Sequence, residues 1–284
     1  MRKMRTKVIT IVVVLIVLLL CAAFRLFDDS AGEVSPDIES TYELEGETLG
    51  GMVSKMPDAS AKILFESILG VKLGSYQSFP TIEESIAALR SNEIQALWCA
   101  DITADYLTKT EDGLHRIDTT DHFEPRLSFA MAVRNEKSEL KDELNEAIIA
   151  LKENGTLDKL ITTYVEFEEK PEPFYEKDMT KEKTNNGTLY VGITGAVPPL
   201  DMVDYEQKPY GFSVAFMDEV GQLLQRKVKM VYLNNDTSFT MLMGGKVDVL
   251  FCYGTSKNTV GTKLNFVMTD GYYEMNQYAY LVVE

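Results

Sequence analysis

The chain carries one local pattern twice, once in each half. A helical stretch, a tight turn and a short apolar strand follow one another in IAALRSNEIQALWC at 86–99 and, in register, in FTMLMGGKVDVLFC at 239–252. A strand of continuous apolar residues is buried on both faces, so helices must cover it on both sides. The repeat predicts two α/β units of one design that face each other, as in a hinged binding protein, although any two helix–strand units share such a pattern.

Hydrophobic periodicity extends each unit. The helix expected at 139–153 carries the apolar stripe Leu140, Leu144, Ile148 and Leu151, with Ser138 as its cap. Thr156 is expected to cap a last helix that ends near 165. The other expected helices are 59–69, 81–90, 102–109, 214–225 and 238–243, and the expected strands are 48–53, 93–99, 128–133, 188–193, 228–232, 247–252 and 277–283.

Polar, charged stretches divide these units from each other and from the N-terminus. Residues 166–186 are rich in acids and lysines, contain Pro171 and Pro173, and have almost no apolar periodicity. That composition is typical of a linker. Residues 28–45 are similarly acidic and are predicted to be a tether.

The N-terminal residues, 1–27, are predicted to be a signal peptide or a membrane anchor. Arg2, Lys3, Arg5 and Lys7 precede the apolar run Val8–Phe24. A basic region followed by an apolar core directs export across a membrane. Cleavage after the small residues near Cys21 and retention as an anchoring helix both remain open. The rest of the chain is expected outside the cytoplasm, bound to the cell membrane or secreted.

Composition excludes several functional classes. The chain has 28 basic against 44 acidic residues and a net charge of -16, which repels nucleic acid. With 2 histidines and 3 cysteines, a Cys/His metal site or a disulfide framework has too few ligands. The glycine pairs lack the spacing of a nucleotide-binding loop. His115 and His122 are expected in a solvated acidic loop. We therefore expect no enzyme, no metal and no cofactor.

The second half resembles the bacterial extracellular solute-binding proteins of family 3, the amino-acid receptors of ABC importers. LYVGITGAVPPLDMVD at 189–204 and YGFSVAFMDEVGQLL at 210–224 are similar to the opening strand, ligand loop and first helix of that family. GGKVDVLF at 244–251 resembles its G-K-V-D strand, and TDGYYEMNQYAYLVVE at 269–284 resembles the segment that enters the interlobe crossover.

The first half resembles the other lobe of the same family. The similar segments are LEGETLGGMVSKMPDASAKILFESILG at 44–70, IEESIAALRSNEIQALWCADITADYL at 82–107 and the closing segment AMAVRNEKSELKDELNEAIIALKENGTLDKLITTYV at 130–165. The resemblance implies a two-lobed periplasmic-binding-protein-like α/β fold of type II after the N-terminal helix. It divides the chain into a lobe-2-like domain (46–134), returning tail helices (135–165), the linker (166–186) and a lobe-1-like domain (187–284).

This order reverses the order in the family. The chain is interpreted either as a circular permutant, in which the linker joins termini that lie close together in the parent fold, or as a slice of a tandem array. Fully extended, the linker spans about 70 Å, which is long enough to join them. We favour the permutant, because a separate half would expose a wide apolar face. The permutant requires the helix at 139–153 to pack against 187–284.

The resemblance also implies ligand-binding positions, several of which carry the wrong residue. The arginine that holds a ligand carboxylate falls at Val260, the two aromatic walls at Val197 and Asn235, and the lobe-2 aspartate at Ala100, next to Asp101. A standard α-amino acid is therefore a poor ligand. The candidate ligand-binding residues are Thr194, Val197, Pro199, Asn235, Cys252, Tyr253, Thr255, Asp58, Ser60 and Asp101.

The expected function is capture of a small, amino-acid-like molecule by hinge closure, for delivery to an ABC permease. The alternatives are a ligand-sensing or degenerate scaffold module of a membrane signalling protein and, less favoured, a dehydratase-type enzyme using Asp58 with Asp101. Trp98, Cys99 and Cys252 end the repeated strands and are expected near the cleft. Two free thiols are expected rather than a disulfide.

Overall fold

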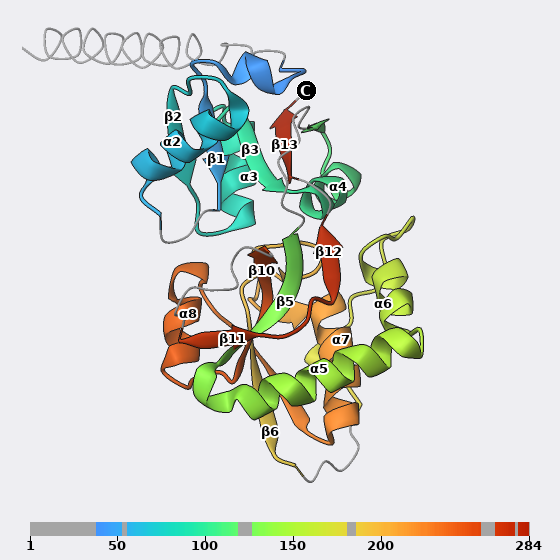
Figure 1. The fold of residues 1–284 in the computed structure, drawn as a ribbon. Coiled ribbons are helices and arrows are strands. Elements are labelled where there is room, and N and C mark those ends of the chain that lie inside the picture. The colour runs from blue at the N-terminus through green and yellow to red at the C-terminus, as the bar shows by residue number, and fades with distance from the viewer. Residues whose placement is uncertain are drawn as a thin grey trace, which may run out of the picture. The chain divides into compact units, whose positions relative to one another are not determined.

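The fold of residues 37–284 is built on two mixed β-sheets, each covered by helices on both faces (Figure 1). The structure is a computed structural model and describes residues 38–52, 56–118, 127–180, 186–256, 265–275 and 278–283. The predicted export segment, the position Val260, and His122 lie outside these residues. Within them, no helix is long and apolar enough to cross a bilayer.

The first sheet has the strand order β2-β1-β3-β13-β4. Strands β1, β2 and β3 are parallel, and β13 runs antiparallel to both of its neighbours. On one face, Phe65 of α2 packs in one core with Leu49 and Tyr280 of the sheet. On the other face, Leu97 and Leu281 belong to the core under α3 and α4. The bounds are β1 Thr48–Gly51, β2 Ser75–Ser78, β3 Ala96–Ala100, β4 Leu114–Asp118, β13 Tyr278–Val283, α2 Asp58–Leu69, α3 Ile82–Arg90 and α4 Asp101–Thr110, after a short 3-10 turn η1 at Thr41–Leu44.

The second sheet has the order β11-β5-β10-β6-β9, with β12 also paired to β5. β6, β9 and β10 are parallel where they pair, while β5 is antiparallel to β10. Helices α5, α6 and α7 cover one face and α8 the other. The bounds are β5 Leu127–Arg134, β6 Thr188–Ile193, β9 Lys227–Tyr232, β10 Val249–Ser256, β11 Phe266–Met268, β12 Tyr273–Met275, α5 Ser138–Glu153, α6 Thr156–Tyr164, α7 Phe212–Leu224 and α8 Asn235–Met243, with a small hairpin of β7 (Met202–Val203) and β8 (Pro209–Tyr210) and the 3-10 turns η2 Asn135–Lys137 and η3 Glu176–Asp178.

The two sheets exchange strands between the chain halves. β5 lies before the linker yet pairs with β10, and β13 ends the described chain yet pairs with β3 and β4 (Figure 1). The predicted boundary at 134 is therefore too late, because β5 belongs to the second sheet. The range 187–284 is likewise too long, because β13 belongs to the first sheet. Local patterning identifies these strands but not their pairing partners, which lie far away in the sequence.

Helix α5 packs as the permutant interpretation requires. Its apolar stripe shares one core with Val191 of β6 and Val249 of β10. Polar contacts flank that core: Arg226 and Glu143 form an ion pair at 2.9 Å, and the Asp270 amide donates to Asn145 Oδ1 at 2.8 Å. The expected packing of this helix against 187–284 is confirmed.

Three local expectations need correction. Ser138 is the first residue of α5 and does not cap it, and Thr156 likewise begins α6, after Gly155 in the left-handed conformation with φ 75°. His115 lies in strand β4, paired with Val282, and not in a loop. Short, polar edge strands such as β4 lack the apolar alternation that sequence patterns detect.

The described part of the predicted linker, residues 166–180, is packed against the fold. Phe167 and Met179 are buried, and Tyr175 forms a β-bridge with Tyr210. Glu176 accepts hydrogen bonds from Lys229 Nζ at 2.7 Å and from the Met230 amide at 2.9 Å. A few apolar side chains spaced along an otherwise polar segment are enough to dock it without helical or strand periodicity.

Truncation of Leu144 to alanine tests the α5 interface. Leu144 is fully buried, whereas Ile149 on the same helix is 46% exposed and serves as the matched control. Loss of a buried leucine side chain costs about 2–5 kcal/mol through lost burial and a residual cavity. We expect Leu144→Ala to lower the free energy of unfolding by that amount in urea titrations. Ile149→Ala should change it by less than about 0.5 kcal/mol, and equal effects would contradict the assigned packing.

Candidate functional site

A cavity of about 300 Å³ lies where strands of both sheets end. In the first sheet, Met52 follows β1, and Trp98, Cys99 and Ala100 form the end of β3. In the second sheet, Thr194 follows β6, Asn235 follows β9, and β10 supplies consecutive residues from Leu250 to Tyr253. The carboxyl ends of parallel strands are where open α/β sheets bind ligands. The described residues that line the cavity are Met52, Ile82, Trp98, Cys99, Ala100, Thr103, Phe129, Thr194, Ala196, Val197, Asn235, Ser238, Leu250, Phe251, Cys252, Tyr253 and Tyr278.

The loop after β6 is built around one buried carboxylate. Asp201 is fully buried, and its Oδ2 accepts from Thr194 Oγ1 at 2.7 Å and from the Thr194 amide at 3.2 Å. Its Oδ1 accepts from the Gly195 amide at 3.0 Å. Burial raises the pKa of this carboxyl, and the hydrogen bonds from the loop oppose that rise. Asp201 thereby fixes the loop that places Thr194, Ala196 and Val197 in the cavity wall.

A buried hydrogen bond joins this loop to the first sheet's helices. Thr103 Oγ1, in the first turn of α4, donates to the carbonyl of Pro198 at 2.7 Å. The peptide bond between Pro198 and Pro199 is cis. Thr103 is itself 1% exposed, so its hydroxyl needs this partner. The contact joins the cavity walls contributed by α4 and by the loop after β6.

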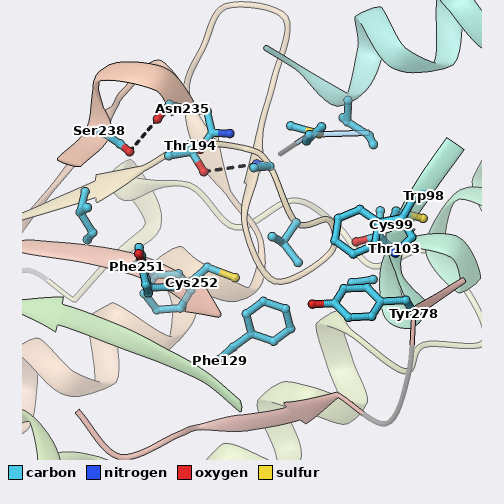
Figure 2. A pocket seen from close by; sticks show the side chains of 17 residues that line it. Trp98, Cys99, Thr103, Phe129, Thr194, Asn235, Ser238, Phe251, Cys252 and Tyr278 are labelled. Atoms are coloured by element: carbon cyan, nitrogen blue, oxygen red, sulfur yellow. Dashed lines mark hydrogen bonds between the residues drawn. The ribbon is translucent and has the colours of Figure 1, made fainter. Parts of the chain in front are cut away.

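An aromatic wall forms one end of the cavity. The rings of Trp98 and Tyr278 are stacked with centroids 4.3 Å apart, and Phe65 meets Trp98 edge-on at 4.9 Å. Figure 2 shows these two stacked rings opposite the group of Thr194, Asn235 and Ser238, with the side chains of Phe129 and Cys252 between the two ends. Burial raises the pKa of Tyr278 to about 12, so its phenol is neutral at physiological pH.

A bulge in β10 shapes the wall opposite. The register against β5 shifts between Leu250 and Tyr253, and Cys252 has φ 56°, in the left-handed region. This conformation is uncommon for a residue with a Cβ, and it occurs often in bulges beside functional sites. The bulge lets Leu250, Phe251, Cys252 and Tyr253 all line the cavity.

Half of the candidate residues from the sequence meet in this cavity. Thr194, Val197, Asn235, Cys252 and Tyr253 line it. Trp98 and Cys99, expected near the cleft, also line it, as does Ala100 at the place of the family aspartate. Cys99 and Cys252 are free thiols.

The other candidates lie elsewhere. Asp58 and Ser60 are exposed on α2, where Asp58 accepts a hydrogen bond from Ser78. Pro199 is buried in the loop and outside the lining. Asp101 is buried at the start of α4, where its Oδ1 accepts from the Ile102 amide at 2.7 Å. Thr255 lies in β10 opposite Ser128, and its side chain is outside the described set.

Sequence reasoning missed Tyr278, Phe129, Thr103 and Ser238. Tyr278 is brought to Trp98 by the antiparallel pairing of β13 with β3, which no local pattern reveals. Ser238 was recognisable from its place in the first turn of α8. Among the described residues, no group of three or more His, Cys, Asp or Glu side chains could hold a metal ion.

Two α/β sheets whose strand ends share one cavity resemble the periplasmic-binding-protein-like fold. Residues 189–282 match the family model of the bacterial extracellular solute-binding proteins, family 3, and the resemblance inferred from the sequence is thereby confirmed. The matched range holds most of the second sheet and β13. The members of this family are binding proteins rather than enzymes.

Solved structures offer more distant likenesses. Arginine-bound, truncated ArgBP from T. maritima has 13% identity and a TM-score of 0.42 over 84% of this chain and 89% of that one. An ancestral arginine-binding protein bound to arginine has 14% identity and a TM-score of 0.41 over 85% and 86%. CbnR, a LysR family transcriptional regulator, has 8% identity and a TM-score of 0.42 over 94% and 71%. No curated protein matches the chain.

The two cavity thiols should resist alkylation. Burial raises the pKa of Cys99 from 9.0 to about 12, and burial together with the charge of Asp201 raises that of Cys252 well above 9.0. At pH 8 the thiolate fraction of Cys99 is therefore about a thousandfold smaller in the folded chain than in the unfolded chain. Peptide mapping after iodoacetamide treatment should show slow labelling of both cysteines in buffer and fast labelling in urea. Equal rates would contradict the raised pKa values of these thiols.

The same pKa shifts predict a pH dependence of stability. The unfolded chain releases the Cys99 proton near pH 9, whereas the folded chain holds it to about pH 12. The thiol therefore lowers stability progressively as the pH rises through that window, and it has no effect below it.

Proposed function

We propose that this chain binds a small molecule in the cavity at the strand ends, as the receptor of a membrane system that acts outside the cytoplasm. The observation that carries the proposal is that carboxyl ends of parallel strands from both sheets, β1 and β3 on one side and β6 and β9 on the other, meet at the same cavity, which the first half of β10 also lines. A ligand there touches both sheets, so it stabilises their apposed arrangement over any arrangement in which they separate.

The proposed partner is an ABC permease, and the proposed tether is the basic and apolar segment at residues 1–27. Family 3 membership over 189–282 supports an extracytoplasmic location. The chain has a net charge of -16, so an anionic membrane surface repels most of it and attracts only the basic N-terminal segment. This charge distribution suits a receptor outside the cytoplasm that is tethered by that segment.

The proposed chain order is a circular permutation of the family order. The pairing of β5 and the packing of α5 with strands from 188–256 support it. Without those strands, β5 would lack a pairing partner and α5 would lack a sheet to cover. The docked linker also supports it, since residues 166–180 lie against the second sheet's elements through Tyr175 and Glu176.

A sensing or scaffold module of a membrane signalling protein is the second candidate. It is favoured by the chemistry of the cavity, where Val197 and Asn235 occupy the positions that the family resemblance assigns to aromatic walls. Loss of the two aromatic walls is compatible with a receptor that binds a different ligand and with a scaffold that binds none. The two differ in whether any small molecule binds.

A ligand screen with a blocked cavity tests the proposal. We expect one class among amino acids, short peptides, organic acids and neutral ring compounds to raise the melting temperature of the full chain, because a ligand at 100 times its Kd adds about 2.7 kcal/mol. The emission of Trp98, the only tryptophan, should change saturably with it. Ala196→Phe places a ring in the cavity and should abolish both responses.

Tyr205→Ala is the matched control, because Tyr205 is 95% exposed on the hairpin of β7 and β8 and outside the cavity. It should leave both responses unchanged. A ligand response that survives in a folded Ala196→Phe variant would place binding elsewhere. A screen with no response in any class would contradict the receptor and support the scaffold.

A further inference from the structure

Among the residues that the structure describes, no side chain that lines the cavity is a strong acid or base, so these residues offer no charge to a ligand. The four arginines within the described residues are all committed to carboxylates: Arg90 to Glu111, Arg116 to Asp105, Arg134 to Glu136 and Arg226 to Glu143. Arg134 also donates to the carbonyls of Leu242 and Val247, at the end of α8.

The two aspartates near the cavity are also occupied. Both oxygens of Asp201 accept hydrogen bonds from Thr194 and Gly195, whereas in Asp101 the Oδ1 atom accepts from the Ile102 amide. Neither carboxylate lines the cavity. A charged ligand group would lose its hydration there without gaining an ion pair, which is a large cost in an apolar site.

The polar end of the cavity mainly accepts hydrogen bonds. Thr194 Oγ1 donates its proton to Asp201, and Ser238 Oγ donates its proton to the Asn235 carbonyl at 2.8 Å. The Thr194 hydroxyl also accepts from the Ala196 amide at 3.4 Å, so what each hydroxyl still offers a ligand is a lone pair and not a proton. The half-buried Asn235 carboxamide has no hydrogen-bond partner among the described residues and can both accept and donate. A ligand must bring N–H or O–H donors to this end.

The opposite end suits a flat ring. Trp98 and Tyr278 present aromatic surface there, and rings pair with it in offset-stacked or edge-on arrangements. The volume of about 300 Å³ lies at the lower end of the range for small-molecule sites. A single ring with one small substituent fits within it.

We propose that the ligand is a neutral, single-ring molecule with an N–H-donating polar group such as a carboxamide, and not a zwitterionic amino acid. The ring contacts the aromatic wall, and the donor group binds Thr194, Asn235 and Ser238 (Figure 2). This inference rests on the proposed function, since it names the class of ligand for the same cavity.

Three probes of similar shape differ in charge. Nicotinamide is neutral, nicotinate is an anion, and 1-methylnicotinamide is a cation with one additional methyl group. L-arginine and L-phenylalanine are the zwitterionic probes. With the full chain, we expect nicotinamide to change Trp98 emission saturably and to raise the melting temperature. Nicotinate, 1-methylnicotinamide and both amino acids should bind at least tenfold more weakly. A linear change in emission that leaves the melting temperature unaltered is collisional quenching and counts as no binding.

Substitutions at Asn235 test the donor–acceptor pattern. Asn235→Ala should weaken nicotinamide at least fivefold, whereas Asp236→Ala, an exposed neighbour outside the lining, should leave it unchanged. Asn235→Asp places a carboxylate at the same point and should reverse the preference, so that 1-methylnicotinamide binds more tightly than nicotinamide. Unchanged nicotinamide binding in a folded Asn235→Ala variant would overturn the assignment of the polar end.

The outcomes distinguish this inference from the proposal on which it rests. If an amino acid or nicotinate binds more tightly than nicotinamide and Trp98 responds, the cavity is a binding site but the ligand class is wrong. If no compound of the wider screen changes either signal, the proposed function fails as well.

Discussion

The fold depends on two exchanged strands. β5 comes from the first half of the chain and lies between β11 and β10 of the second sheet, while β13 comes from the end and lies between β3 and β4 of the first. Both are interior strands, so removing either would cut a sheet in two and expose its unpaired backbone groups. Tyr280 and Leu281 of β13 are fully buried on opposite faces. Neither half of the chain can complete its own sheet.

This exchange also builds the cavity. Because β13 runs beside β3, Tyr278 reaches Trp98 and completes the aromatic wall. Because β5 runs beside β10, Phe129 and the β10 bulge occupy the facing wall. The walls are therefore fixed by sheet pairing, whereas the loop from Thr194 to Leu200 is fixed by the buried carboxylate of Asp201. A site held by strands and one carboxylate keeps its shape before a ligand arrives.

The sequence predicts the elements better than their pairing. Strand β6 is observed at the predicted residues 188–193, and the stripe of α5 is buried as expected, because strong period-2 and period-3.6 patterns need no tertiary information. Strands β2 and β4 escaped detection since SYQS and LHRID show little apolar alternation. The domain boundaries erred at β5 and β13, whose partners lie across the chain.

The site was predictable only where a motif marks it. Thr194 and Val197 lie between a recognisable strand and the Pro198-Pro199 pair, and Cys252 ends the repeated strand, so local sequence marks them. Asp58 and Ser60 were inferred from resemblance alone, and α2 turns both toward solvent. The residues that give the cavity its character, Tyr278 and Phe129, enter it from the exchanged strands. Local sequence thus locates the loop after β6, while the long-range pairing of β5 and β13 decides what that loop faces.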